Sequence, residues 1–191
     1  MEKSNIVIIG GAFAGMMTGL ALARKGHSVT VLDWDPGQLP KKTDDLFEQW
    51  NRIGCPQTKH AHAFLARVHN EIRDNEPELL QALLDHGAEE LTFLEMVGES
   101  NADYSTEQGD EDLTSLACRR ILFDWVLRNY LLEKELVEIK SGQKVVGLLS
   151  ELASASLDAP QGISRIVGVQ AEQEDGSIIE IPADFVIDAS G

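Results

Sequence analysis

Residues 5–35 limit the possible folds of this chain more than any other stretch. The run at residues 6–9 is short, apolar and β-branched, a pattern typical of a strand buried on both faces of a parallel sheet. Gly10, Gly11 and Gly15 follow it directly. Glycines at this spacing allow a tight turn and let a helix start close to the strand it leaves. The pattern therefore predicts strand, turn and helix in immediate succession.

The next segment completes a βαβ unit. Apolar side chains continue to Ala23, and Gly26 follows a basic pair that suits the end of a helix. Residues 28–32 predict a second buried strand, which leads into Asp33, about 20 residues beyond the first glycine. A helix N-terminus favours a pyrophosphate, and a carboxylate at this position favours ribose hydroxyls. We therefore expect a dinucleotide-binding site.

The glycine pattern is not the strict G-x-G-x-x-G. Ala12 stands where the second glycine belongs, and Phe13 and Ala14 complete the turn. One methyl group must then fit beside the phosphates. The alternative is an ordinary βαβ unit whose small residues serve packing alone. The order of strand, turn, helix, second strand and terminal acid favours dinucleotide binding.

Composition excludes several classes of function. The 191 residues are 43% hydrophobic and 25% charged, as in ordinary globular proteins, and the formal charge is −16, which disfavours nucleic acid and anionic membranes as partners. No apolar run approaches 18 residues, so we expect no membrane span, and the immediate first strand predicts no signal peptide. Two distant cysteines favour reduced thiols. These observations together predict a cytoplasmic protein.

A mainly helical insertion is expected at about residues 40–118. One helix has its apolar positions from Phe64 to Ile72, and Pro77 opens another that ends before Gly87. Residues 91–97 predict a strand, and residues 99–112 form an acidic stretch that suits a solvated loop.

The last third of the sequence predicts one helix followed by strands. The helix covers about residues 121–134, with Arg119 and Arg120 at its start. Cations at a helix N-terminus oppose the helix dipole. The two arginines therefore indicate either a nearby anion or an ordinary surface pair. Strands are expected at residues 136–139, 144–149, 165–171, 177–181 and 183–188, with a hairpin turn at Asp175 and Gly176. The final strand is apolar enough to be central in its sheet, and we expect it to stay uncovered unless something beyond residue 191 or a partner covers it.

Four segments resemble one family of flavoproteins. The opening IVIIGGAFAGMMTGLALARKGHSVTVLDWD and the closing ADFVIDASG are similar to stretches shared by many flavoproteins. GCPQTKHAHAFL and RILFDWVLR resemble segments of one branch. Together they resemble the N-terminal half of FAD-dependent monooxygenases of the aromatic-hydroxylase type, related to geranylgeranyl reductases and flavin halogenases. The resemblance implies an α/β fold: a Rossmann-like FAD-binding parallel sheet with an inserted three-stranded β-meander and a helical insertion.

The resemblance also implies roles for individual residues. Asp33 replaces the commoner glutamate and Trp34 replaces a frequent arginine. The residues placed at the cofactor by the resemblance are Gly10, Gly11, Ala12, Phe13, Ala14, Gly15, Asp33, Trp34, Gln57, His60, Arg120, Val145, Asp188 and Gly191. In such enzymes the flavin carries the chemistry, with NAD(P)H as reductant, so no side chain is assigned as catalytic.

Other catalytic patterns have little support. His60 and His62 alternate, but no cysteine or carboxylate at ligand spacing accompanies them, so no metal is expected. A Ser/His/Asp arrangement has no motif support either, because the sequence contains no G-x-S-x-G nucleophile motif.

Three functions remain open: a flavin monooxygenase acting on a small organic substrate, another flavin enzyme such as a polyprenyl reductase or halogenase, and a non-catalytic dinucleotide-binding partner subunit. The family places its Gly-Asp motif beyond residue 191. We therefore expect either a C-terminal continuation or a second polypeptide to complete the fold.

Overall fold

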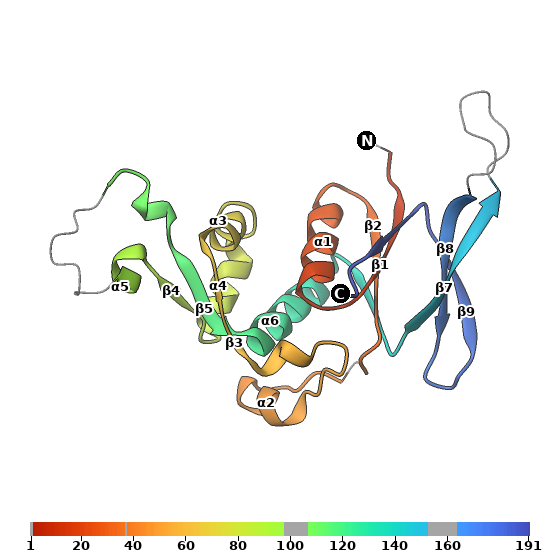
Figure 1. Ribbon diagram of the computed structural model, residues 1–191, viewed down its shortest axis with the longest axis horizontal. Helices are drawn as coiled ribbons and strands as arrows, with labels where there is room; N and C mark the ends of the chain where they lie inside the picture. Colours follow the sequence, from red (N-terminus) through yellow and green to blue (C-terminus); the bar gives the residue numbers. More distant parts are fainter. Residues whose placement is uncertain (1, 37, 98–106, 153–163) are drawn as a thin grey trace. The chain divides into compact units, whose positions relative to one another are not determined.

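The parallel sheet is built around the apolar strand near the start of the chain. The computed structural model describes residues 2–36, 38–97, 107–152 and 164–191. Strand β1 (Asn5–Ile9) is joined to β2 (Ser28–Asp33) through helix α1 (Phe13–Arg24). β6 (Glu138–Ser141) pairs with β2, and β10 (Phe185–Asp188) pairs with β1, all in parallel (Figure 1). The order β10-β1-β2-β6 confirms the predicted Rossmann-like sheet.

Each face of this sheet is covered by a different layer. Ile8 and Val31 point toward α1, where a Cβ added at Gly19 would lie 3.4 Å from the nearest Val31 methyl group. Val7 and Leu32 point the other way and pack in one cluster with buried residues of β8. Because successive side chains alternate between faces, a strand buried on both sides needs the continuous apolar run that the sequence shows.

The second layer is an antiparallel meander, as predicted. β7 (Lys144–Leu152), β8 (Ser164–Glu172) and β9 (Ile178–Pro182) pair in that order. The turn between β8 and β9 contains Gly176 at φ +81°, and the Asp175 carboxylate accepts a 2.9 Å hydrogen bond from the N–H of Ser177. The Asp-Gly pair therefore forms the turn for which its conformational freedom suits it.

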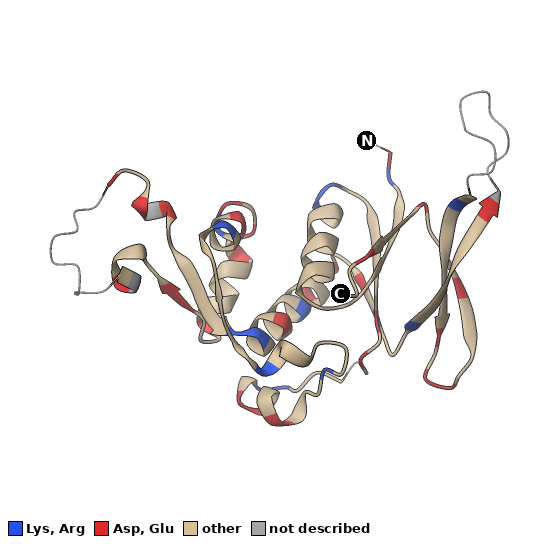
Figure 2. Ribbon diagram, in the orientation of Figure 1, with Lys and Arg blue, Asp and Glu red and all other residues tan. Residues whose placement is uncertain are grey.

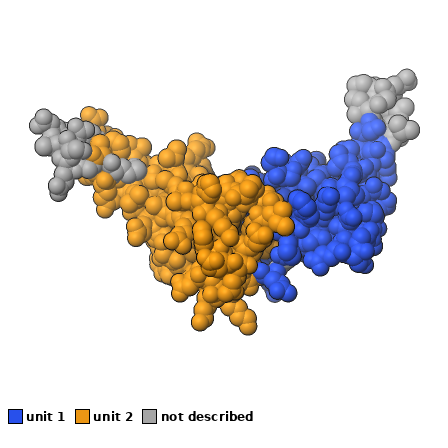
Figure 3. All heavy atoms as spheres, turned by 60° about the horizontal axis from the view of Figure 1, so that its bottom comes forward, with its two compact units in different colours: residues 1–38, 131–191 blue, residues 39–130 orange. Residues whose placement is uncertain are grey.

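The chain divides into two compact units (Figure 3). Met1–Gln38 and Leu131–Gly191 form the first unit, described above, and Leu39–Tyr130 form the second. Helix α6 (Arg120–Glu133) contributes residues to both. No helix in the described ranges combines the length and the apolar character needed to span a bilayer.

The second unit contains the helices of the predicted insertion, and it also holds an antiparallel sheet that the sequence did not indicate. Its sheet has the order β3-β5-β4. In chain order its elements are the 3₁₀ helix η1 (Thr43–Asp45), α2 (Leu46–Gln49), the 3₁₀ helix η2 (Pro56–Lys59), β3 (Ala61–Phe64), α3 (Ala66–Asn75), α4 (Pro77–Asp85), β4 (Glu89–Leu91), α5 (Phe93–Val97), the 3₁₀ helix η3 (Asp110–Asp112) and β5 (Ser115–Arg119).

Two of the sequence predictions in this unit are corrected. Phe64 lies in β3 rather than in a helix, because β3 pairs with β5, and this tertiary pairing overrides the helical period. Residues 93–97 form a helix rather than a strand. Thr92 and Glu95 form a capping box: the Thr92 hydroxyl accepts from the N–H of Glu95, and the Glu95 carboxylate accepts from the N–H of Thr92 at 2.8 Å. That T-x-x-E signal was present in the sequence.

The final strand is apolar enough to be central, but among the described residues it lies at one edge of its sheet. β10 pairs with β1 on one side and forms the edge of the sheet, where Phe185 is 60% exposed. Of the predicted acidic loop, residues 98–106 lie outside the described ranges, and Asp110–Asp112 form a short 3₁₀ helix.

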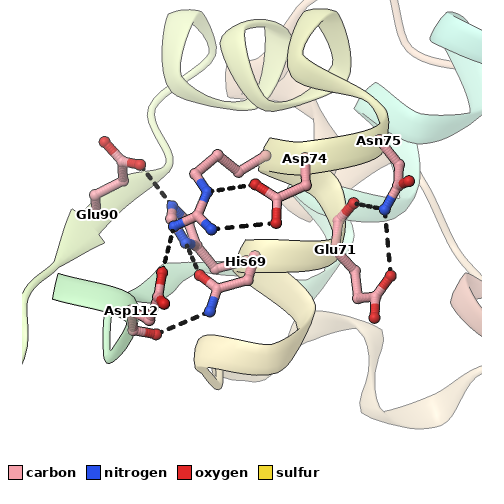
Figure 4. A network of polar contacts seen from close by, with 8 residues as sticks. His69, Glu71, Asp74, Asn75, Glu90 and Asp112 are labelled. Carbon is pink, nitrogen blue, oxygen red and sulfur yellow. Dashed lines mark hydrogen bonds and ion pairs between the residues drawn. The ribbon is translucent and has the colours of Figure 1, made fainter. Parts of the chain in front are cut away.

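A buried histidine connects α3 to its neighbours in the second unit (Figure 4). Nε2 of His69 lies 2.6 Å from Oε1 of Glu90 in β4, and Nδ1 lies 3.1 Å from Oδ1 of Asn70. The Asn70 amide donates to the carbonyl oxygen of Asp112, and Arg73 donates to the Asp112 carboxylate at 3.1 Å. These contacts fasten α3 to both β4 and η3, so the network serves the packing of this unit.

Candidate functional site

The glycine turn lies between β1 and α1 in the first unit. Backbone atoms crowd the Cα positions of Gly10 and Gly15. Gly10 has φ +109°, and a Cβ there would lie 2.5 Å from the carbonyl oxygen of Ala189. A Cβ on Gly15 would collide with the carbonyl oxygen of Gly10. Glycine is therefore required at both positions, by conformation at the first and by close approach at the second.

Helix α1 starts directly after this turn. Ala12 is its N-cap residue and has no side-chain oxygen, so no side chain caps the helix; the N–H of Met16 bonds to the carbonyl oxygen of Ala12 at 3.0 Å. Phe13 and Ala14 form the first turn, and no acidic side chain is present there. The positive end of the helix dipole is thus not neutralised within its own first turn, which suits an anion.

Asp33 lies beside the same turn, at the end of β2. Its side chain is 4% exposed and lies against Gly11, where an added Cβ would be 2.5 Å from Oδ2. The N–H of Asp35 donates to Oδ1 of Asp33 at 3.3 Å. Because β1 and β2 are parallel, their carboxyl ends meet at one edge of the sheet, where ligands of open α/β sheets bind. The structure therefore brings together the glycine turn, the start of α1 and Asp33.

A hollow of about 370 Å³ lies next to Asp33. It is lined by Trp34, which is 53% exposed, and by Lys144, whose Nζ lies 5.6 Å from the centre of the Trp34 ring. Glu172 and Glu174 are the acidic side chains of its lining. Lys144 was not among the predicted site residues. Its position in sequence gives no direct signal, because it comes near Trp34 through the contact of β7 with β2.

Val145 and Asp188 were both predicted to lie at the cofactor, and the structure puts them in different surroundings. Val145 packs against the hydrophobic cluster that contains Leu32. Oδ1 of Asp188 accepts hydrogen bonds from the hydroxyl of Ser190 at 2.7 Å and from its N–H at 3.0 Å, which together hold the pKa of the Asp188 carboxyl below its usual value. The N–H of Ala189 donates to the carbonyl oxygen of Ile9, so residues 188–191 lie at the same sheet edge as the glycine turn, with Gly191 at φ +94°.

The other three predicted site residues belong to the second unit, and the structure groups them. Gln57 is exposed in η2, and its carbonyl oxygen accepts from the N–H of His60 at 3.1 Å. The carbonyl oxygen of His60 accepts in turn from the N–H of Arg120 at 3.2 Å. These two backbone hydrogen bonds link Gln57 to His60 and His60 to the start of α6.

Arg120 is held by a buried carboxylate that was not singled out from the sequence. Its Nε donates to Oδ1 of Asp124 at 3.0 Å, and NH1 of Arg52 lies 3.8 Å from Oδ2 of the same carboxylate. The side chains of Arg52 and Asp124 are almost fully buried. The i, i+4 spacing of Arg120 and Asp124 was a signal for one of these pairs. No sequence pattern indicated Arg52.

Cys118 lies close to this cluster and should be chemically inert in the folded protein. Burial and, to a smaller extent, the charge of Asp124 raise the pKa of its thiol from 9.0 to about 12, against the opposing effect of Arg120. At pH 8 we expect alkylation of Cys118 by iodoacetamide to be roughly a thousandfold slower than for a thiol of ordinary pKa, because the thiolate is the nucleophile. Mass spectrometry of a Cys55→Ser variant isolates this thiol, with the urea-unfolded variant as control. Modification of the folded variant at the unfolded rate would contradict the assignment.

Among the described residues, no group of three or more His, Cys, Asp or Glu side chains is arranged to hold a metal ion. The carbonyl oxygen of His60 lies 3.0 Å from Nδ1 of His62, so one ring nitrogen of His62 is already engaged locally.

Known structures share this fold, although no protein-family model and no curated protein matches the sequence. The myxobacterial chondrochloren halogenase, an FAD-dependent halogenase, is 20% identical with a TM-score of 0.63, over 100% of this chain and 38% of that chain. A flavoprotein/dehydrogenase from Cytophaga hutchinsonii is 17% identical with a TM-score of 0.63, over 100% and 40%. Anhydrotetracycline hydroxylase from Streptomyces rimosus is 15% identical with a TM-score of 0.62, over 100% and 32%.

These similarities span the whole chain but less than half of each of these three structures. At such low identity they show a shared fold, and the functions of those proteins are not transferred by it. At the level of the fold, the similarity to part of an FAD-dependent halogenase and to part of a hydroxylase is confirmed.

Proposed function

We propose that this chain is the FAD-binding part of a flavin-dependent oxidoreductase, and that the enzyme is a monooxygenase acting on a small organic substrate with NAD(P)H and O₂. The observation that carries the proposal is the burial of Asp33 against Gly11, beside the start of α1. An acid, a crowded glycine turn and a helix N-terminus at one sheet edge are the parts that a dinucleotide requires.

The described residues fit this cofactor. Gly10, Gly11 and Gly15 carry no side chains, so a pyrophosphate could approach the backbone of the turn and the N-terminus of α1. Asp33 would accept hydrogen bonds from the adenosine ribose. Trp34, with Lys144 beside it, offers an exposed aromatic surface for the adenine end.

The flavin, when bound, would supply the redox chemistry with O₂ and the organic substrate. The chain's own residues would bind, orient and shield it. Arg120, held by Asp124, would present a fixed positive charge to a phosphate or to the flavin edge. Gln57 and His60, tied to the start of α6, would approach the flavin from the second unit.

A second candidate is a flavin halogenase or a polyprenyl reductase on the same scaffold. It is favoured by the flavin-dependent halogenases among the structures that share the fold, such as CmlS at 18% identity and a TM-score of 0.63, over 100% of this chain and 30% of that chain. A third is a non-catalytic dinucleotide-binding partner. Flavin absorbance of the purified protein separates the first two from a protein that binds no flavin. Substrate-coupled consumption of O₂ with NAD(P)H and without halide separates a monooxygenase from a reductase, which uses no O₂, and from a halogenase, which needs halide.

We propose further that a continuation of the chain or a second polypeptide completes the enzyme. Two observations support this: β10 forms an exposed sheet edge with Phe185 outside, and the chain spans 38% of the chondrochloren halogenase. Exposed edges are sites of strand addition. Co-purification with a strand that pairs with β10 would support the proposal. Substrate-coupled turnover by this chain as a monomer would contradict it.

The ribose site is tested by Asp33→Ala. We expect FAD affinity to fall by about 1–3 kcal/mol, the scale of hydrogen bonds to a charged group, with little change in the far-UV circular dichroism. Quenching of flavin fluorescence during titration measures the affinity. Glu138→Ala is the matched control, since Glu138 is an exposed acid at the start of β6 on the same sheet. Equal affinity in both variants would place the ribose site elsewhere.

A further inference from the structure

One exposed aromatic ring of the second unit lies near two cationic side chains. Phe47 in α2 is 40% exposed. Nζ of Lys59 lies 5.2 Å from the centre of its ring and Cζ of Arg119 lies 5.8 Å from it. The three side chains come from three elements, η2, α2 and β5, so the tertiary structure assembles them. A second planar group could stack on the exposed part of such a ring and contact the cations beside it.

These two cations have no opposing charge of their own. Neither Lys59 nor Arg119 forms an ion pair with any residue in the described ranges, although acidic residues outnumber basic ones 32 to 16 in the sequence. Figure 2 shows Lys and Arg at the junction of β5 and α6, within a chain in which acidic positions are more frequent. Two cations that each contact the same exposed ring, without an ion pair in the described ranges, favour an external anion.

A hollow of about 300 Å³ opens beside the ring. Phe47, Arg119 and His86 line it, and the buried side chains of Leu46 and Ile121 give it an apolar floor. Nδ1 of His86 is bonded to the carbonyl oxygen of Ala82 at 2.7 Å, and its ring packs at 5.2 Å against Trp125. The hollow therefore has a fixed wall, and its volume is at the lower limit of ligand sites, which suits one or two rings.

We propose that this hollow binds a small planar ring that carries an anionic group. The ligand ring would stack on Phe47, and its anionic group would pair with Arg119. Lys59, which also contacts the Phe47 ring, would add its positive charge. A guanidinium suits carboxylates and phosphates alike. Asp44 also lines the hollow and weakens the site for an anion. The inference does not depend on FAD binding, since none of the residues that line this hollow is assigned to the cofactor.

The test is a titration of the full chain, without added flavin, monitored by nuclear magnetic resonance. The probes are 2-naphthoate and adenosine 5′-monophosphate, with neutral 2-naphthamide and adenosine as their controls. We expect at least one anionic probe to bind with a dissociation constant below about 10 mM and to shift the resonances of Phe47 and Arg119. Preference for naphthoate indicates an aromatic acid as the ligand, and preference for the monophosphate indicates a nucleotide.

Variants then separate this site from general attraction. Arg119→Gln should weaken the preferred probe about tenfold, a change of 1.4 kcal/mol, and Phe47→Leu should weaken it by a similar factor. Asp44→Asn should strengthen it. Arg67→Gln is the matched control: Arg67 is an exposed arginine of the same unit, paired with Glu71, and its loss should leave binding unchanged. Equal binding of the neutral probes, no binding of either anion, or full affinity in Arg119→Gln would overturn the proposal.

Discussion

Replacing Gly15 with valine is expected to abolish FAD binding and to lower the free energy of unfolding by roughly 3 kcal/mol or more. The Cβ alone would collide with the carbonyl oxygen of Gly10, and backbone yields less readily than the end of a side chain. The turn must then open, which moves α1 away from the strand and spoils the phosphate approach. Flavin fluorescence titration and urea unfolding measure the two effects.

The matched control for this variant is Gly26→Ala, at the other end of the same helix. Gly26 has φ +91° with nothing within 4 Å of an added Cβ, so the substitution strains the backbone without a collision. We expect it to cost about 1 kcal/mol of stability and to leave FAD affinity unchanged. A folded Gly15→Val protein that binds FAD with native affinity would refute the assignment of this turn.

The second large effect is expected at Asp124. Asp124→Leu removes the carboxylate that Arg120 and Arg52 share, and leaves two guanidinium groups with little access to water. Removing one partner of a buried ion pair typically costs about 3–5 kcal/mol, because the remaining charge loses that partner where water cannot replace it. Urea unfolding followed by tryptophan fluorescence suits this site, since the Arg52 guanidinium lies 5.0 Å from the centre of the buried Trp50 ring.

Two further variants make the Asp124 result specific. Arg67→Ala removes an exposed i, i+4 pair with Glu71 and should change stability by less than about 0.5 kcal/mol. The double variant Asp124→Leu with Arg52→Met should recover part of the loss, because one of the two guanidinium groups that lost this carboxylate is then also gone. If Asp124→Leu alone stays within 1 kcal/mol of the parent, the pairs do not stabilise the second unit.

The first unit was predictable because its information is local. The run at residues 6–9 is apolar on both faces, the glycines follow without a gap, and Asp33 ends the next strand. Periodicity and glycine placement act over a few residues, so the sequence alone indicated the βαβ unit and the meander with its Asp175-Gly176 turn. The same locality predicted that Gly10, Gly15 and Asp33 would meet, because carboxyl ends of parallel strands share an edge.

The second unit was less predictable because its structure depends on distant pairing. Phe64 belongs to a strand because it pairs with Leu116 of β5, which lies 52 positions later in the sequence. The helix at residues 93–97 had a local signal in Thr92 and Glu95, but the apolar run around it also suited a strand. The apolar residues of the final strand suit a central position, whereas its actual position in the sheet depends on which strands pair with it.

The site residues divide in the same way. The sequence alone identified the glycine turn and Asp33, because their geometry follows from a single βαβ unit. Tertiary structure alone brought Lys144 to Trp34, Arg52 to Asp124, and both Lys59 and Arg119 to Phe47. The partners in these contacts are separated by 110, 72, 12 and 72 positions in the sequence. Local patterns carry no information on such contacts, because side chains so far apart in sequence meet only when the whole chain is packed.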